Sequence, residues 1–303
     1  MNDPNLTGVL VIDKEKGPTS HDIVASLRRI VGMRRIGHCG TLDPLATGVL
    51  VLCLGRFTRL NRWLNGADKE YLATIFLGAT SRTGDAQGPV IAASNVQPPA
   101  EGDLASALDA LTGEIDQVPP DFSAVKVGGV RSYKRARRGE EIALKARRVK
   151  IATINLISYE FPKVVVRVQC SSGTYIRSLA QDLGRALETG AYLADLRRLR
   201  VGNLGLDMAL TMDQVFVQHK AGRLVDAFAH PRQALGELAT IELNPDELVE
   251  FTHGKAVESP SLNGVQRDIC AVFDSSETLF GIGRYENGLL RPFCVLRSHQ
   301  ASA

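Results

Sequence analysis

The first fifty residues place a short apolar run before an amphipathic stretch. Residues 8–12 are continuously apolar (GVLVI) and predict a short buried strand. Residues 21–31 carry apolar side chains at helical spacing, and Thr19 or Ser20 can cap a helix that begins there. With a turn over residues 13–18, the first unit is predicted to be a strand, a turn and a helix.

Later segments mix the two periodicities. Residues 49–54 and 71–77 read as strands, and residues 104–111 read as a helix. Between them, residues 78–88 are rich in Gly, Asp and Thr and predict a loop. Valines alternate with polar residues over 164–170, which predicts a strand that leads into a helix over about 175–187. Because strands and helices mix without a regular repeat, we expect an α+β or mixed α/β fold.

The last sixty residues change in character. Residues 231–245 contain two prolines at their ends and read as a linker. Beyond it, short apolar runs at 269–273, 279–282 and 293–296 are separated by glycines. This pattern predicts a small β-rich domain.

Length and composition limit the class of protein. The chain has 303 residues and is 44% hydrophobic, which suggests about two domains at roughly 150 residues each. Its longest apolar stretches reach about eight residues, far below the roughly 18 to 20 that span a bilayer. The first residues, MNDPNLTG, do not read as a secretory signal. We therefore expect a cytoplasmic protein with no membrane partner.

Cysteine and histidine usage gives no sign of a metal. The five cysteines are scattered without a C-x-x-C pair, and the six histidines show no chelating spacing. We expect reduced, mostly buried thiols and no structural metal.

The charge is unevenly distributed. The chain has a net charge of +3, yet residues 126–150 hold ten Lys or Arg against two acids. Such a cluster attracts polyphosphate, so nucleic acid is a natural partner, and a solvated charged face is the alternative. The ten basic residues are Lys126, Arg131, Lys134, Arg135, Arg137, Arg138, Lys145, Arg147, Arg148 and Lys150.

The segment 37–48 (GHCGTLDPLATG) is the strongest candidate for chemistry. Its glycines and Asp-Pro step predict a rigid loop that presents side chains. Asp43 can be a reactive carboxylate, but a residue that caps the following turn is the more common use of such an aspartate. Cys39 activated by His38 is a weaker alternative, because no feature of the sequence lowers its pKa. Asp43 and Asp85 as magnesium ligands are another.

Tyr175 and Arg177 stand at a junction between strand and helix. From that position the ring can stack on a base and the guanidinium can pair with a carboxylate. The ordinary alternatives are a half-buried packing tyrosine and a surface arginine.

Taken together and in order, five motifs resemble those of the bacterial tRNA pseudouridine synthase B (TruB) family. The resemblance covers about residues 8–202, and the five motifs are more specific as a set than any one of them. The motifs are GHxGTLDPxATG at 37–48, KxY at 69–71, SAxK at 123–126, GTYIR at 173–177 and LRRL at 196–199. Cys39 stands where the family has a small residue or threonine, and Arg59 stands near a position that is often lysine.

The resemblance implies isomerisation of uridine 55 in the T-arm loop of tRNA to pseudouridine, without metal or organic cofactor. Asp43 then has the role of catalytic carboxylate, and Arg177 that of the arginine paired with it. Tyr71 matches the tyrosine that stacks on the extruded base, whereas Tyr175 and Leu196 match residues that line its pocket. His38 matches the histidine that contacts the RNA loop.

The resemblance also implies an architecture. We expect a mixed, mainly antiparallel sheet flanked by helices in a catalytic domain over 1–232, with a basic thumb-like insertion over about 119–148. A PUA-like RNA-binding domain is expected over 240–303. The insertion is expected to bind RNA through Lys126, Arg131, Lys134, Arg135, Arg137 and Arg138. The partner is the T-arm stem-loop of tRNA, and the protein is expected to be a monomer.

An RNA-binding or RNA-folding protein without chemistry remains the alternative from another class. The presence of Asp43, Tyr71 and Arg177 together argues against a lost activity. Turnover by the wild-type protein separates the two hypotheses.

Overall fold

The computed structural model describes residues 6–258 and 268–297, except 124, 128, 133, 134, 136, 137, 139 and 141–143. Within these residues, ten strands form one large sheet with the path β14-β1-β3-β12-β4-β11-β10-β7, to which β2 adds beside β3 and β13 beside β12. The strands are β1 (Gly8–Lys14), β2 (Ile36–Cys39), β3 (Thr47–Leu54), β4 (Lys69–Leu77), β7 (Gly113–Gln117), β10 (Arg147–Glu160), β11 (Lys163–Cys170), β12 (Ala191–Val201), β13 (Leu204–Gly205) and β14 (Phe228–Ala229).

The N-terminal half of this sheet has apolar side chains on both faces. Along β1, Leu10 and Ile12 join one buried cluster, whereas Val9 and Val11 join another. Because successive side chains of a strand point to opposite faces, a continuous apolar run is what a strand covered on both faces requires. Helices α1 (Ser20–Val31) and α6 (Met212–Lys220) contribute to the first cluster, and η1 (Gly55–Leu60) and α2 (Asn61–Gly66) to the second.

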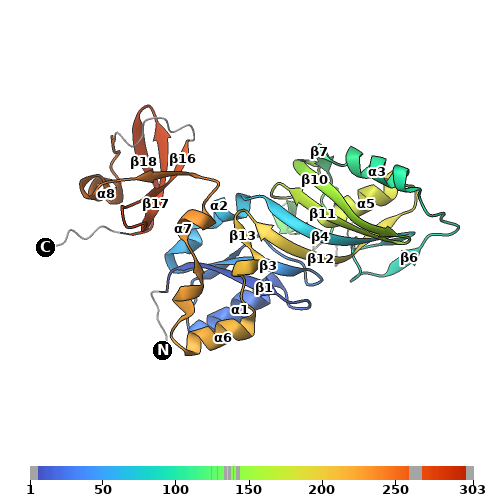
Figure 1. Ribbon diagram of the computed structural model, residues 1–303, viewed down its shortest axis with the longest axis horizontal. Helices are drawn as coiled ribbons and strands as arrows, with labels where there is room; N and C mark the ends of the chain where they lie inside the picture. Colours follow the sequence, from blue (N-terminus) through green and yellow to red (C-terminus); the bar gives the residue numbers. More distant parts are fainter. Residues whose placement is uncertain are drawn as a thin grey trace.

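The other half of the sheet is covered by α3 (Glu101–Ala110) and α5 (Ile176–Ala186), which lie together beside β10, β11 and β4 (Figure 1). Helix α5 begins directly after Tyr175, whose backbone is held at both polar groups by Gln117. Gln117 Oε1 accepts from Tyr175 N at 2.8 Å, and Gln117 Nε2 donates to Tyr175 O at 3.1 Å. The start of α5 is therefore fixed to the end of β7.

Strand β12 joins the two halves of the sheet. It pairs in parallel with β3, where Arg198 lies opposite Gly48, and antiparallel with β4, where the same residue lies opposite Tyr71. The β3 contact is short, since only Arg197 and Arg198 are in register with it. This junction brings the segment before β3 next to β4 and β12, which is where the candidate site lies.

A second, four-stranded sheet follows, with the order β15-β16-β17-β18. Its strands are β15 (Ala239–Glu242), β16 (Ile269–Phe273), β17 (Leu279–Glu286) and β18 (Leu289–Val295), and α8 (Pro245–Thr252) packs on it. Leu248 and Phe251 of α8 share a buried cluster with Val272. Figure 1 shows this sheet beyond α7 (Pro231–Ala234), on the side of α2.

Short elements complete the described chain. Residues 79–92 form a small hairpin, and the basic insertion contains another. These strands are β5 (Ala79–Ser81), β6 (Val90–Ala92), β8 (Lys126–Val127) and β9 (Val130–Arg131), and two further 3-10 turns are η2 (Leu206–Met208) and η3 (Leu224–Ala227). No helix in the described part of the chain is long and apolar enough to cross a membrane.

Most strands and helices predicted from the periodicity are present, but four local predictions were wrong. The start of the segment 37–48 is not loop, because Ile36–Cys39 pairs with β3. The loop predicted over 78–88 contains strand β5. The linker predicted over 231–245 contains helix α7 and strand β15, which pairs with β16. The basic segment 126–150 was expected to be an inserted loop-and-helix element outside the core sheet, but its last basic residues lie in β10 of the large sheet. The domain boundaries at 232 and 240 remain a prediction.

Candidate active site

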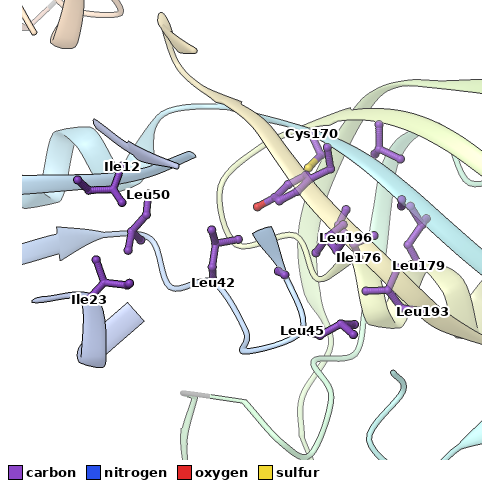
Figure 2. Packing of buried hydrophobic residues seen from close by; sticks show 14 of the residues in the cluster. Ile12, Ile23, Leu42, Leu45, Leu50, Cys170, Ile176, Leu179, Leu193 and Leu196 are labelled. Atoms are coloured by element: carbon purple, nitrogen blue, oxygen red, sulfur yellow. The ribbon is translucent and has the colours of Figure 1, made fainter. Parts of the chain in front are cut away.

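Asp43 lies in the turn between β2 and β3, between two anchored leucines. Leu42 and Leu45 are 3% and 4% exposed, and both belong to the large core cluster (Figure 2). Leu42 lies toward Leu50 in that view, whereas Leu45 lies toward Leu193 of β12. Burial of the leucines on either side fixes the backbone that carries Asp43.

Polar contacts hold the same turn from several elements. The Ser20 hydroxyl accepts from Leu42 N at 2.8 Å, and Gly17 N donates to Pro44 O at 2.9 Å. Lys14, which is fully buried, donates from Nζ to Ala46 O at 2.7 Å. The turn itself is closed by Ala46 N, which donates to Asp43 O at 3.0 Å. The backbone around Asp43 is therefore rigid while its side chain stays 37% exposed.

Arg177, the second residue of α5, pairs with Asp43. Its Nε lies 3.0 Å from Asp43 Oδ2 and 3.7 Å from Asp85 Oδ2. The side chains of Arg177 and Asp85 are 6% and 4% exposed, so both are buried, whereas that of Asp43 is partly exposed. A guanidinium that serves two carboxylates leaves the exposed one oriented toward any molecule that enters the site.

The remaining donors of Arg177 bind backbone carbonyls. Nη1 donates to Thr83 O and Nη2 to Phe122 O, each at 3.0 Å. Phe122 lies in the insertion, close to where it leaves the main fold. Asp85 is held in turn by the Thr83 hydroxyl at 2.7 Å and by Gln87 N at 3.0 Å. One side chain thus connects Asp43, the loop after β5 and the basic insertion.

The charge of Asp43 is balanced between opposing effects. Burial raises the pKa of its carboxyl above the ordinary 3.8, and the negative charge of Asp85 raises it further. Arg177 and Lys14 act against this rise. Burial also lowers the pKa of Lys14 to about 8, although Asp43 partly offsets the shift. Lys14 was not singled out from the sequence, because a lysine at the end of a strand reads as a surface residue.

Tyr71 and Arg198 lie beside each other on β4 and β12. Tyr71 is 8% exposed, and burial raises the pKa of its phenol. Arg198 is 1% exposed and donates from Nε to Val49 O at 2.7 Å and from Nη2 to Gly40 O at 3.0 Å. The sequence pattern did not mark Arg198 as part of the site, since it lies in a run of charged residues.

The other predicted substrate-binding residues surround this region. Tyr175 is half-buried, and the guanidinium carbon of Arg147 lies 5.2 Å from the centre of its ring. Leu196 is 7% exposed, and Figure 2 shows it near Ile176 and Leu193. His38 lies on β2 with its Nδ1 buried and unbonded, and burial lowers its pKa. Their roles toward a substrate remain predictions.

The two other chemistries weighed for this segment fit poorly. Cys39 is fully buried with its Sγ 3.4 Å from Cys53 Sγ, so it is not placed as a nucleophile. Between Asp43 and Asp85 a guanidinium already takes the place that a shared magnesium ion would need. In the described residues, no group of three or more His, Cys, Asp or Glu could hold a metal ion.

The basic insertion is described only in part. Lys134 and Arg137 lie outside the described residues, and for Lys126 and Arg131 the structure gives only the backbone of the β8–β9 hairpin. Arg135 pairs with Glu140 at 2.6 Å, and Arg138 lies 3.8 Å from the same carboxylate. RNA binding by these six residues stays a prediction.

Comparison with known proteins points to one family. Residues 28–176 match the model of the TruB family pseudouridylate synthase N-terminal domain, and residues 177–230 match that of the tRNA pseudouridylate synthase B C-terminal domain. The second match includes β12 and β14 of the large sheet. The tRNA pseudouridine synthase B of Mycobacterium sp. (strain KMS) is 43% identical over 265 residues, covering 85% of this chain and 86% of that protein. That of Thermobifida fusca (strain YX) is 46% identical over 230 residues, covering 73% and 78%.

Two solved structures share the fold. A Cbf5-Nop10-Gar1 complex has a chain with a TM-score of 0.75 and 26% identity, covering 96% of this chain and 85% of that one. An archaeal box H/ACA sRNP Nop10-Cbf5 complex has one with a TM-score of 0.74 and 24% identity, covering 97% and 88%. These likenesses confirm the expected mixed fold with a β-rich C-terminal region.

The two family models follow each other along the chain and together include Arg177, Tyr71 and Asp43, the residues that the fold gathers at the β2–β3 turn. Relatives above 40% identity extend the similarity over most of the chain. This protein therefore belongs to the tRNA pseudouridine synthase B (TruB) family, an isomerase family.

Proposed function

We propose that this protein isomerises uridine 55 in the T-arm loop of tRNA to pseudouridine, with Asp43 as the catalytic carboxylate. The observation that carries the proposal is the Asp43–Arg177 ion pair, in which a partly exposed carboxylate is held at 3.0 Å by a buried guanidinium. Family membership supports a tRNA substrate, because the relatives that share most of the chain are tRNA pseudouridine synthases B.

The reaction needs a charged group in a fixed place but no change of oxidation state. The bond between N1 of uracil and C1′ breaks, the base turns, and C5 bonds to C1′, while one proton leaves C5 and one is taken up at N1. A carboxylate can attack the substrate or stabilise the cleavage step only when it is ionised. Arg177 and Lys14 favour that ionised form against the effect of burial.

The reacting uridine must leave the folded arm before Asp43 can reach it. Extrusion of a base costs a few kcal/mol, which contacts with the protein must offset. Tyr71 and Leu196 are buried and Tyr175 is half-buried, and burial lowers the pKa of His38 on β2. We assign stacking to Tyr71, the pocket wall to Tyr175 and Leu196, and loop contact to His38.

The insertion and the C-terminal sheet are assigned to RNA binding. Phosphate contacts by lysine and arginine give affinity that depends on salt, whereas the shape of the RNA loop gives selectivity. Arg177 contacts both Asp43 and the backbone of Phe122, so it connects the carboxylate to the start of the segment that we assign to RNA binding. We also propose that the protein acts as a monomer in the cytoplasm, where its tRNA substrate is found, and without a metal.

The deciding experiment compares wild type with Asp43→Asn on a T-arm transcript and on whole tRNA. Pseudouridine is mapped by mass spectrometry after incubation with excess enzyme in buffer containing EDTA. We expect modification at uridine 55 by the wild type, none by Asp43→Asn, and RNA affinities that agree within about threefold, because the asparagine keeps the shape of the side chain. Asp182→Asn is the matched control, since that aspartate pairs with Arg185 on α5 away from the site.

The outcomes separate the hypotheses. Turnover retained in Asp43→Asn would disprove the role of Asp43. Modification at another uridine would disprove the proposed specificity but not the class of reaction. Loss of wild-type turnover with EDTA would favour a metal-dependent enzyme, and tight RNA binding without any turnover would favour the RNA-binding protein without chemistry.

A further inference from the structure

Arg198 is a buried cation without a buried anion. It is 1% exposed and is the largest of the fully buried side chains. In the described part of the chain it forms no ion pair within 4 Å, unlike Arg177, and it donates hydrogen bonds to two backbone carbonyls, Val49 O and Gly40 O. Burial of a charge without a carboxylate is costly, so a hydrophobic residue would serve better if packing were all that this position required.

The two carbonyls that Arg198 binds stand at the two ends of the Asp43 turn. Gly40 O, at 3.0 Å from Nη2, is where the chain leaves β2, and Val49 O, at 2.7 Å from Nε, follows the entry into β3. One planar guanidinium therefore spans the turn and fixes the separation of its ends. Asp43 lies between these two points.

The turn is built to let Arg198 come this close. Gly48 has φ +95°, and a Cβ there would lie 2.1 Å from Arg198 O. Gly40 has φ +86°, and a Cβ there would meet Arg198 Nη1 at 3.4 Å. Gly48 is needed both for its backbone conformation and for the space that the backbone carbonyl of Arg198 occupies, whereas Gly40 is favoured by its backbone conformation.

On its other side Arg198 faces Tyr71. The two residues are direct partners in the β12–β4 pairing, and the guanidinium interacts with the phenol, where it opposes the effect of burial on the Tyr71 pKa. A guanidinium offers five donors in one plane, whereas an ammonium offers three on a flexible stem. The arginine can therefore bind the two ends of the turn and face the hydroxyl at once, which a lysine cannot reproduce.

We propose that Arg198 is a positioning residue that sets the distance between the Asp43 turn and Tyr71, so that the carboxylate and the ring meet the extruded uridine together. This inference rests on the proposed function. Arg198 does not act on the substrate itself. Its effect passes through Asp43, by way of Gly40 and Val49, and through Tyr71.

The test is a double-mutant cycle with Arg198→Lys and Tyr71→Phe, read as the single-turnover rate of pseudouridine formation at saturating enzyme. Arg198→Lys should lower this rate by about 100-fold, the size expected when a reacting group moves by about 1 Å. RNA affinity should stay within about threefold of wild type. In the Tyr71→Phe background the same substitution should cost less than about 30-fold, because the contact between the guanidinium and the phenol, through which Arg198 positions the ring, is already lost.

Two controls separate positioning from folding. Arg232→Lys changes another arginine that packs on a ring, that of Phe273, and pairs with Glu277 at 2.9 Å, far from the site. It should lower the melting temperature and leave the rate unchanged. Should Arg198→Lys not fold, Gly40→Ala strains the backbone at φ +86°, next to the carbonyl that Arg198 binds, with the arginine intact, and it should lower the rate with unchanged affinity.

A single-turnover rate within about threefold of wild type in Arg198→Lys would overturn the inference. A loss of rate that equals the unfolded fraction of the variant would also overturn it. So would a double mutant whose rate loss is the product of the two single losses, because Arg198 and Tyr71 would then act independently. The proposed function is tested separately, because it fails only if the wild type does not form pseudouridine or if Asp43→Asn does.

Discussion

The buried guanidinium of Arg177 lies between two carboxylates, those of Asp43 and Asp85, and it is closer to Asp43. Asp43 lies at 3.0 Å and Asp85 at 3.7 Å from the same Nε. Two carboxylates around one guanidinium leave an excess of negative charge, and the charge of Asp85 adds to burial in raising the pKa of Asp43. Asp85 therefore belongs to the electrostatics of Asp43 although its own side chain is buried.

The pH dependence of turnover should show how Asp85 and Lys14 change the pKa of Asp43. Because the pKa of Asp43 is raised, its carboxylate is lost on acidification at a pH above 3.8, and the acid limb of the single-turnover rate should have its midpoint there. Asp85→Asn removes a charge that raises this pKa, so the midpoint should move to lower pH. Lys14→Met removes a charge that lowers it, so the midpoint should move to higher pH.

Rates measured between pH 4 and 8 on a T-arm transcript check both signs. Asp182→Asn is the control and should leave the midpoint in place, because that residue lies in a surface pair. If Asp85→Asn and Lys14→Met shifted the midpoint in the same direction, the charge balance described for Asp43 would be wrong.

The residues of the site differ in how well the sequence could identify them. Patterns alone favoured a capping role for Asp43, and only its order with Tyr71 and Arg177 indicated chemistry. The contact between Arg177 and Asp85 was not foreseen, since 92 positions separate them and periodicity carries no information on such pairs. Lys14 and Arg198 were missed for another reason. Charged residues are almost never fully buried, so nothing in the sequence indicated that either one lies in the interior.

At the scale of elements, β12 determines the geometry of the site. Its sequence LRRLRV reads as an exposed basic stretch, yet Arg198 faces the interior and Leu196 lines the core. The parallel contact with β3 holds for two residues only, so neither strand reveals it by its own pattern. The strands were predicted where apolar alternation is strong, as in β11, and missed where buried charge interrupts it.

Gly48 of β3 lies directly against Arg198 of β12, and a side chain at this position should strongly lower the stability of the fold. A Cβ would lie 2.1 Å from Arg198 O, and φ of +95° disfavours any side chain. Gly48→Ala should lower the free energy of unfolding by more than about 2 kcal/mol, since clash and backbone strain add. Urea unfolding measures the loss, and the folded fraction should also turn over more slowly.

Gly102→Ala is the matched control in helix α3. A Cβ there meets nothing within 4 Å, and alanine is favoured over glycine in a helix by up to about 1 kcal/mol. The two substitutions should therefore change stability with opposite signs. Equal stability of Gly48→Ala and wild type would mean that the β3–β12 contact is looser than the structure gives.

The basic insertion offers a second test at this scale. Glu140 holds Arg135 at 2.6 Å and lies 3.8 Å from Arg138, so part of the positive charge is engaged within the insertion. Glu140→Gln should free both arginines for phosphate. Affinity for tRNA should rise, and the slope of log K against log salt should steepen by about 0.7 to 0.9 for each new phosphate contact.

Fluorescence anisotropy with labelled tRNA from 50 to 300 mM KCl measures that slope. Asp182→Asn removes an acidic charge from another surface pair and should not change it. An unchanged slope in Glu140→Gln would show that Arg135 and Arg138 do not reach the RNA backbone.

At the scale of the whole molecule, the two sheets meet through side chains from both. One buried cluster contains Leu60 and Leu64 from η1 and α2 together with Phe273 and Ile282 from the C-terminal sheet. A pocket of about 320 Å³ lies beside this contact, lined by Trp63, Asn203, Glu237 and neighbouring residues. The C-terminal sheet is thus held on the main fold by a shared core.

The strands of the C-terminal sheet were largely predictable from the sequence, but its contact with the main fold was not. Glycine-separated apolar runs indicated β16, β17 and β18 from the sequence. Strand β15 lies in the stretch read as a linker, because four residues are too few to show alternation, and it pairs in parallel with β16 across an intervening helix. Which faces meet depends on contacts between distant residues that no local pattern encodes.

The fluorescence of Trp63 can report on the contact between the C-terminal sheet and the main fold, because it is the only tryptophan of the chain. Its ring packs edge-on against that of Phe293 in β18, with 5.8 Å between the two ring centres. The guanidinium of Arg62 lies over both rings. Phe293→Ala should remove about 1 kcal/mol of aromatic packing and shift the Trp63 emission to longer wavelength as the ring meets water. Phe216→Ala changes another half-exposed phenylalanine, on α6 near Lys220, and should leave the emission unchanged.

The same variant distinguishes the two parts of the RNA interaction. In the proposed function, turnover of an isolated T-arm uses the β2–β3 turn, α5 and β12, whereas Phe293 contacts Trp63 and Arg62, so Phe293→Ala should match wild type on that substrate. The C-terminal sheet is proposed to bind RNA, so binding of whole tRNA should weaken by several-fold when that sheet is held less firmly. Equal losses on both substrates would contradict this division, because they would mean that the Asp43 site moves together with the contact between the C-terminal sheet and the main fold.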